Sequence, residues 1–64
     1  WATTQNNLGL AHQNFPTGHR RENLKNAIAC FRNALRVYTQ KSFPREHKLA
    51  SENLARALAQ LQSL

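Results

Sequence analysis

The chain has 64 residues, which is enough for one small domain at most. Nine Lys or Arg residues stand against three Glu and no Asp, so the net charge is +6 and few carboxylates are present for acid–base catalysis. The one cysteine, Cys30, excludes an internal disulfide and a multi-cysteine zinc site, and a lone thiol favours a cytoplasmic (intracellular) setting. No apolar run approaches the ~20 residues of a membrane span. We therefore expect no membrane span, no enzyme and no cofactor.

Apolar residues recur every three or four positions in three segments, which is typical of amphipathic helices. The first predicted helix covers residues 2–14 and ends before Phe15-Pro16-Thr17-Gly18, where proline and glycine favour a turn. The second covers residues 22–40 and has the clearest apolar stripe. The members of that stripe are Leu24, Ala27, Ile28, Phe31, Ala34, Leu35 and Tyr38.

Cys30 lies beside this stripe, so we expect a buried, unreactive thiol. The third predicted helix covers residues 45–63, with Ser42 as its expected N-cap and Pro44 fitting the first turn. No strand pattern appears anywhere. The sequence therefore predicts an all-α fold of three helices.

The chain repeats part of itself at an offset of 46 residues. Asn7-Leu8-x-x-Ala11 falls on Asn53-Leu54-x-x-Ala57, and Gly9 falls on Ala55. A small residue at position 9 lets a second helix approach closely, and Ala27-x-x-x-Phe31-x-x-Ala34 offers a matching small–large–small face. Such helices pack as an antiparallel pair, and stacked pairs form an α-solenoid.

These residues resemble a known family. Leu8-Gly9-x-x-His12, Ala27-x-x-x-Phe31-x-x-Ala34 and Pro44 follow the tetratricopeptide pattern W-x2-L-G-x2-Y…A-x3-F…P. Gln5 stands where that pattern has Trp, and His12 where it has Tyr. The usual period is 34 residues, and the excess here falls in residues 15–22 and 40–46.

The longer period is similar to the extended repeats of cyanobacterial tetratricopeptide proteins, through residues 1–11, 22–28 and 37–39. Residues 47–55 also resemble kinesin-light-chain-type repeats. The resemblance implies an antiparallel helix-turn-helix repeat, an α-solenoid of the tetratricopeptide type. We expect a single unit from a longer array, in which the third helix begins the next repeat or caps the array.

In this family the first helix of each unit lines a concave face, which implies binding of a peptide or partner protein there. Asn7 and Asn53 recur one repeat apart, and each amide is able to bond the backbone of an extended peptide or, alternatively, a neighbouring turn. Asn6 and Leu10 stand where some relatives carry a Lys–Asn carboxylate clamp, which argues against a clamp here. The other residues expected on this face are Thr3, Gln13, Asn14 and Arg56.

A basic turn consists of His19, Arg20, Arg21 and Lys25. With the cations that follow it, this turn has the charge to track phosphates. No aromatic residues are interleaved for base stacking, so a solvated face is favoured over nucleic-acid binding. The three histidines are scattered along the chain, and we expect no metal site.

The leading hypothesis is a non-enzymatic scaffold for protein–protein interaction. One alternative is a structural subunit or homo-oligomer, and another is binding of RNA or an acidic surface through the basic turn. Apolar residues at both flanks should lack cover within the chain, so self-association or neighbouring repeats are expected. These are Trp1, Leu10 and Val37 on one side, and Leu61 and Leu64 on the other.

Overall fold

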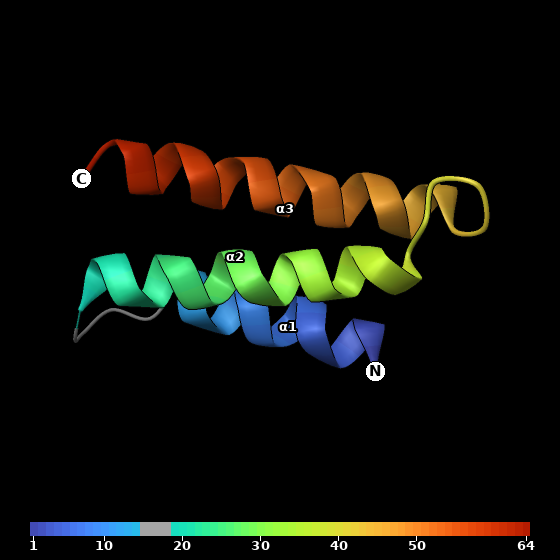
Figure 1. The fold of residues 1–64 in the computed structure, drawn as a ribbon, viewed down its shortest axis with the longest axis horizontal. Coiled ribbons are helices and arrows are strands. Elements are labelled where there is room, and N and C mark those ends of the chain that lie inside the picture. The colour runs from blue at the N-terminus through green and yellow to red at the C-terminus, as the bar shows by residue number, and fades with distance from the viewer. Residues whose placement is uncertain (15–18) are drawn as a thin grey trace.

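A computed structural model describes residues 1–14 and 19–64 and places them in three α-helices, with no strand among the described residues. The helices are α1 (Ala2–Gln13), α2 (Arg20–Val37) and α3 (Pro44–Gln62). In Figure 1, α2 runs antiparallel to both neighbours, so α1 and α3 point the same way. The all-α prediction with three packed helices is confirmed, while the predicted turn at residues 15–18 lies outside the described residues.

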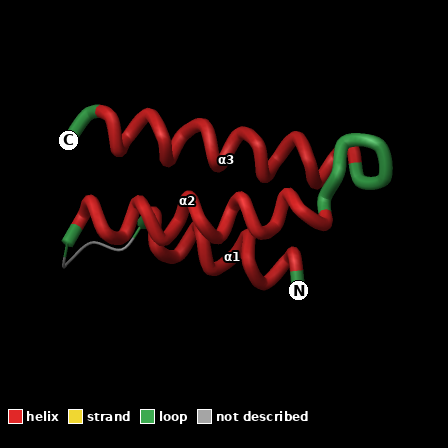
Figure 2. The backbone as a smooth tube through the Cα atoms, viewed as in Figure 1, coloured by secondary structure: helices red, strands yellow, loops and turns green. Residues whose placement is uncertain are grey.

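Helix α2 begins two residues before the predicted Glu22 and ends at Val37, three residues before the predicted end. Tyr38 leaves the helical region, with φ −81° and ψ 73°, and the backbone N–H of Thr39 donates to the carbonyl of Val37 at 2.9 Å. This is the geometry of an inverse γ-turn, which stops a helix. The loop that follows connects α2 to α3 in Figure 2.

The start of α3 differs from the prediction in one respect. Pro44 occupies the first turn as expected, but the N-cap is Phe43, without a side-chain cap bond. The backbone N–H of Ser42 instead donates to Thr39 Oγ1 at 3.3 Å, inside the turn. The prediction of a Ser42 cap is therefore wrong, because that serine lies within the loop.

The core lies along α2, which packs against both other helices. Its predicted apolar stripe is buried from Leu24 to Ala34, with Leu24 and Phe31 fully enclosed, while Leu35 and Tyr38 are half-buried. Leu54, Leu58 and Leu61 of α3 pack against this stripe, as does Leu10 of α1. The expectation that Leu10 and Leu61 lack cover is wrong, because each lies on the side of its helix that meets the core.

Gly9 sets the spacing between α1 and α2. A Cβ added at this position would lie 2.5 Å from Cε1 and 2.8 Å from Cδ1 of Phe31. The prediction that a small residue here permits close approach is confirmed. Leu8, the residue beside it, is 44% exposed and faces away from the core.

Candidate functional site

Two amide pairs connect α1 to α3 and form a polar seam. Asn53 donates from Nδ2 to Asn6 Oδ1 at 3.3 Å, and Gln13 donates from Nε2 to Gln60 Oε1 at 3.5 Å. On each helix the two members are seven residues apart, about two helical turns. The bonds therefore hold two parallel helices in one register.

A polar surface borders this seam and shares Asn53 and Gln60 with it, and we call it the α1–α3 face. On α1 it follows the spacing three and four through Thr3, Asn7, Leu10 and Asn14. On α3 the same spacing selects Leu49, Asn53, Arg56 and Gln60. Most of these side chains are exposed, while Leu10, Asn53 and Gln60 are half-buried at its inner edge.

Some of the residues predicted for a peptide-binding surface are exposed in the structure, and others are buried between helices. Thr3, Asn7, Asn14 and Arg56 are exposed, as a contact with a partner requires. The Thr3 hydroxyl also hydrogen-bonds the Tyr38 hydroxyl. These four residues remain candidates for the site.

Gln13 does not lie on the exposed surface, contrary to expectation. It is only 3% exposed, because its position on α1 turns it into the seam with α3. Asn6 is half-buried in the same seam. Both amides serve the packing of the helices.

The two asparagines expected to act alike have different surroundings. Asn7 is exposed. Asn53 donates to Asn6, and its Oδ1 accepts from Arg56 Nη1 at 3.3 Å. Asn7 is therefore the more exposed of the two amides, while the Asn53 amide is bonded within the molecule.

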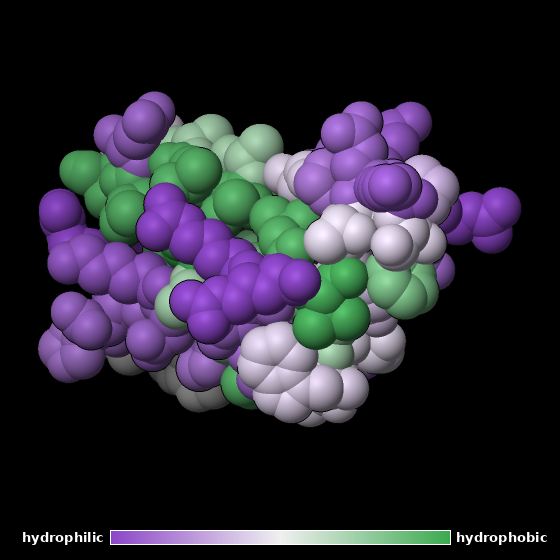
Figure 3. Space-filling model, turned by 45° about the vertical axis from the view of Figure 1, so that its right-hand side comes forward, coloured by the Kyte–Doolittle hydropathy of each residue, from purple (hydrophilic) through white to green (hydrophobic). Residues whose placement is uncertain are grey.

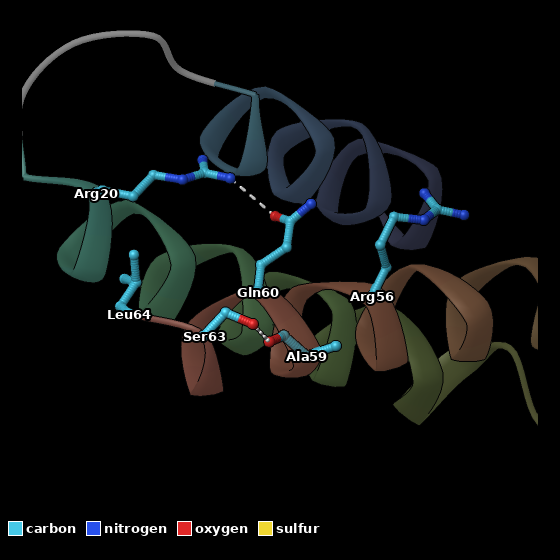
Figure 4. Close-up of a pocket in the computed structure, with 6 residues that line it drawn as sticks. All are labelled: Arg20, Arg56, Ala59, Gln60, Ser63 and Leu64. Atoms are coloured by element: carbon cyan, nitrogen blue, oxygen red, sulfur yellow. Dashed lines mark hydrogen bonds between the residues drawn. The ribbon is translucent and has the colours of Figure 1, made fainter.

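An open hollow of ≈ 400 Å³ lies where α2 begins and α3 ends (Figure 4). Arg20 extends across it from α2, and its Nη2 donates to Gln60 Oε1 at 2.8 Å. Arg20 also bonds the carbonyl of Gln13, the last residue of α1. Such terminal carbonyls have no partner inside their own helix, so Arg20 caps α1. The hollow is lined by Arg20, Arg56, Ala59, Gln60, Ser63 and Leu64.

Sequence reasoning missed four of these lining residues, namely Ala59, Gln60, Ser63 and Leu64. The only signal was spacing, because Gln60 follows Arg56 by four residues and shares its helix face. No pattern along the chain connects them to Arg20, which approaches from another helix.

The predicted basic turn does not form one continuous patch. Arg20 is half-buried and turned inward, because it shares a helix face with Leu24 and Ala27 of the core. His19, Arg21 and Lys25 are exposed. A helix rotates by about 100° per residue, so Arg21 and Arg20 point in different directions.

Cys30 is buried as predicted, and loss of solvent around the thiol raises its pKa. The thiol is therefore protonated at neutral pH and a poor nucleophile. Within residues 1–14 and 19–64, no three His, Cys, Asp or Glu side chains gather in a way that suits a metal ion. None of the helices in this part of the chain combines the length and hydrophobicity needed to cross a bilayer.

Hydrophobic side chains also reach the surface. Figure 3 shows one face of the molecule where a hydrophobic area lies between groups of hydrophilic side chains. The large exposed apolar residues are Trp1, Leu8, Val37, Phe43, Leu49 and Leu64. Comparison of the chain with protein families, with curated protein sequences and with solved structures found no match in any of the three.

Proposed function

We propose that this chain is a unit of a tetratricopeptide-type helical array that binds a partner protein or peptide on its α1–α3 face. One observation carries the proposal. Several positions related by the 46-residue offset are buried on one of the two helices α1 and α3 and exposed on the other.

The first flank of the molecule is the outer side of α1, and it illustrates this difference. On α3 a stripe of small and apolar residues packs against α2, and two of its alanines are buried. The matching stripe on α1 is exposed. The equivalent pairs are Thr4 and Ala50, Leu8 and Leu54, and Ala11 and Ala57. The exposed stripe of α1 therefore has the composition and spacing to receive a helix like α2.

The second flank is the outer side of α3, where the exposed residue is on α3 and its buried equivalent is on α1. Gly9 is buried against Phe31 of α2, whereas its equivalent Ala55 on α3 is exposed. Helix α3 thus presents a small residue where α1 packs its partner helix. Each flank offers one half of a helix–helix contact, as expected of a repeat that buries its faces against neighbours.

The α1–α3 face supports the binding part of the proposal. Asn7 and Asn14 expose amides that both donate and accept hydrogen bonds, the chemistry that an extended peptide backbone requires. Leu49, 54% exposed, offers an apolar contact among them. In an array this face would continue from unit to unit.

A tandem protein tests the repeat. Residues 1–46 are duplicated before the full chain, so that the added second helix is able to cover the original Leu8. We expect Leu8→Ser at the covered position to lower the free energy of unfolding by about 1.5–3 kcal/mol. The same change in the single chain should stay within about 0.5 kcal/mol. Equal effects in the two proteins, measured by urea unfolding, would contradict the proposal.

Peptide selection tests the binding. Peptides of about twelve residues are selected by phage display on the tandem protein and measured by fluorescence anisotropy. We expect the double variant Asn7→Ala, Asn14→Ala to weaken binding by about tenfold. The matched control is Asn26→Ala, Ala29→Ser, which alters two exposed positions of α2. Equal loss in the control would place the binding surface elsewhere.

A further inference from the structure

The hollow at the end of the α1–α3 face is lined by two arginines and by no Asp or Glu side chain among the described residues. Arg20 reaches it from the first residue of α2, and Arg56 from the middle of α3. Gln60 lies between them in Figure 4 and accepts a hydrogen bond from Arg20. Neither Asp nor Glu occurs among the lining residues.

Both arginines have hydrogen-bonding capacity left over. A guanidinium carries five N–H donors. Arg20 is bonded to Gln60 and to the Gln13 carbonyl, and Arg56 to Asn53. Because the Arg20 bonds fix its planar group in place, it is oriented in advance for an anion, which reduces the entropy lost on binding.

The rest of the lining identifies the kind of anion. Ala59 and Leu64 contribute apolar surface beside the charged groups, and Ser63 contributes a hydroxyl. A carboxylate on a short aliphatic stem matches this combination, because its methylenes pack on the apolar part while its oxygens meet the Arg20 guanidinium. None of the described residues that line the hollow is aromatic, so they offer a nucleic-acid base nothing on which to stack.

We infer that the hollow binds a glutamate side chain of an extended partner peptide, so that the partner is an acidic segment. This inference rests on the proposed partner-binding function and specifies the chemistry of one end of that surface. The chain's charge of +6 attracts such a segment from a distance. The Arg20 guanidinium then selects a carboxylate at this place, and Arg56 adds positive charge on the other side of Gln60.

The test uses a fluorescent peptide of about ten residues in which Glu alternates with Ser, with an amidated C-terminus. The same peptide with Gln for Glu is the ligand control. The informative variant is Ala59→Glu, which adds a carboxylate to the hollow at an exposed position. Its matched control is Ala55→Glu, an equal charge change on the same helix outside the lining.

We expect anisotropy titrations to show about tenfold weaker binding of the Glu peptide to Ala59→Glu, and less than about twofold weakening for Ala55→Glu. Arg56→Gln should weaken binding more than Arg32→Gln, which removes an exposed charge from α2. Circular dichroism verifies that all four variants are folded. Arg20 is left unchanged because it also caps α1.

Several results would overturn the inference. Equal losses within each matched pair would show attraction by net charge alone. Binding of the Gln peptide as tight as that of the Glu peptide would exclude a carboxylate. Tighter binding of a single-stranded RNA of similar length, weakened by Ala59→Glu, would assign the hollow to phosphate. Display-selected peptides that bind the α1–α3 face with an affinity unchanged by Ala59→Glu would contradict the inference about the hollow but leave the proposed function intact. If no peptide binds, both the inference and the proposed function are contradicted.

Discussion

Gly9 lies inside a helix, where glycine ordinarily costs about 0.5–1 kcal/mol relative to alanine. Its place is explained by the ring of Phe31, which occupies the space that a side chain would need. Phe31 is fully buried and has no room to withdraw. The close approach of α1 to Phe31 of α2 thus depends on the absence of a side chain at Gly9.

We expect Gly9→Ala to destabilise the chain, against the usual trend for helical glycines. Overpacking typically costs about 1–3 kcal/mol, which outweighs the gain in helix propensity. Urea unfolding of Gly9→Ala, of Phe31→Leu and of the double variant forms a cycle that measures their coupling. A higher melting temperature for Gly9→Ala would show that α1 is able to move away from α2.

Gln13 carries a buried oxygen without a partner. Its Nε2 bonds Gln60, but its Oε1 has no hydrogen-bond partner in the described part of the chain. A buried unsatisfied acceptor costs about 1–3 kcal/mol. We expect Gln13→Leu to be neutral or stabilising by up to about 1 kcal/mol, because it removes that oxygen at similar volume.

The control for Gln13→Leu is Gln62→Leu, at an exposed position of α3, which should change stability by less than about 0.5 kcal/mol. A loss of stability on Gln13→Leu in chemical denaturation would show that the seam depends on this amide.

At the scale of the element, α2 has two distinct faces. Ala27 is fully buried on the core side, and Ala29 is exposed on the opposite side. We expect Ala27→Leu to lower the free energy of unfolding by about 1–3 kcal/mol through overpacking. Ala29→Leu should leave it nearly unchanged. Thermal melts with equal midpoints for the two variants would contradict this orientation of α2.

Helix α1 contributes fewer large apolar side chains to the core than α2 does. It has 12 residues, a length that is marginal for an isolated helix. Its N-cap Trp1 makes no side-chain cap bond, and its buried residues are only Ala2, Gly9 and Gln13. Helix α2, by contrast, buries Leu24 and Phe31 completely.

We therefore expect the backbone amides of α1 to exchange with deuterium faster than those of α2 in the same sample. Local opening has a low free energy where few apolar contacts are lost. In the tandem protein the second copy of α1 gains a neighbour, and its exchange should slow. Uniform protection of α1 and α2 in the single chain would mean that the three helices open only together.

At the scale of the whole molecule, the three helices form a thin body with extents of 36 × 21 × 13 Å. So thin a body leaves apolar side chains uncovered on its flanks. Trp1 is 67% exposed and Leu64 54%, and both were predicted to lack cover. A buried side chain of this size stabilises by about 1.5–3 kcal/mol, so covering several matters to a small domain.

We expect the isolated chain to associate with itself through these flanks. Its melting midpoint should rise with protein concentration, and Trp1 fluorescence should shift to shorter wavelength as the indole leaves water. Sedimentation that shows a folded monomer at high micromolar concentration, with a melt independent of concentration, would contradict this. The three helices would then be stable as a small bundle, and the argument for an array would weaken with them.

The sequence by itself determined which residues share a helix face. The stripe of α2 from Leu24 to Ala34 is buried as its spacing predicts, and the all-α fold of three helices follows from that periodicity. Gly9 was identified as a close approach for the same reason. Periodicity is a local property, and it is encoded along the chain.

Only the tertiary structure decided which neighbour covers each face. Leu8 is exposed and Gln13 buried, because α1 is enclosed by α2 and α3 on one side alone. Arg20 does not join the other residues of the predicted basic turn on the surface. Its side chain caps α1 and bonds Gln60, which is 40 residues away along the chain. A repeating pattern gives equivalent residues the same spacing, but their burial depends on where neighbouring helices lie, and that is a property of the packed molecule.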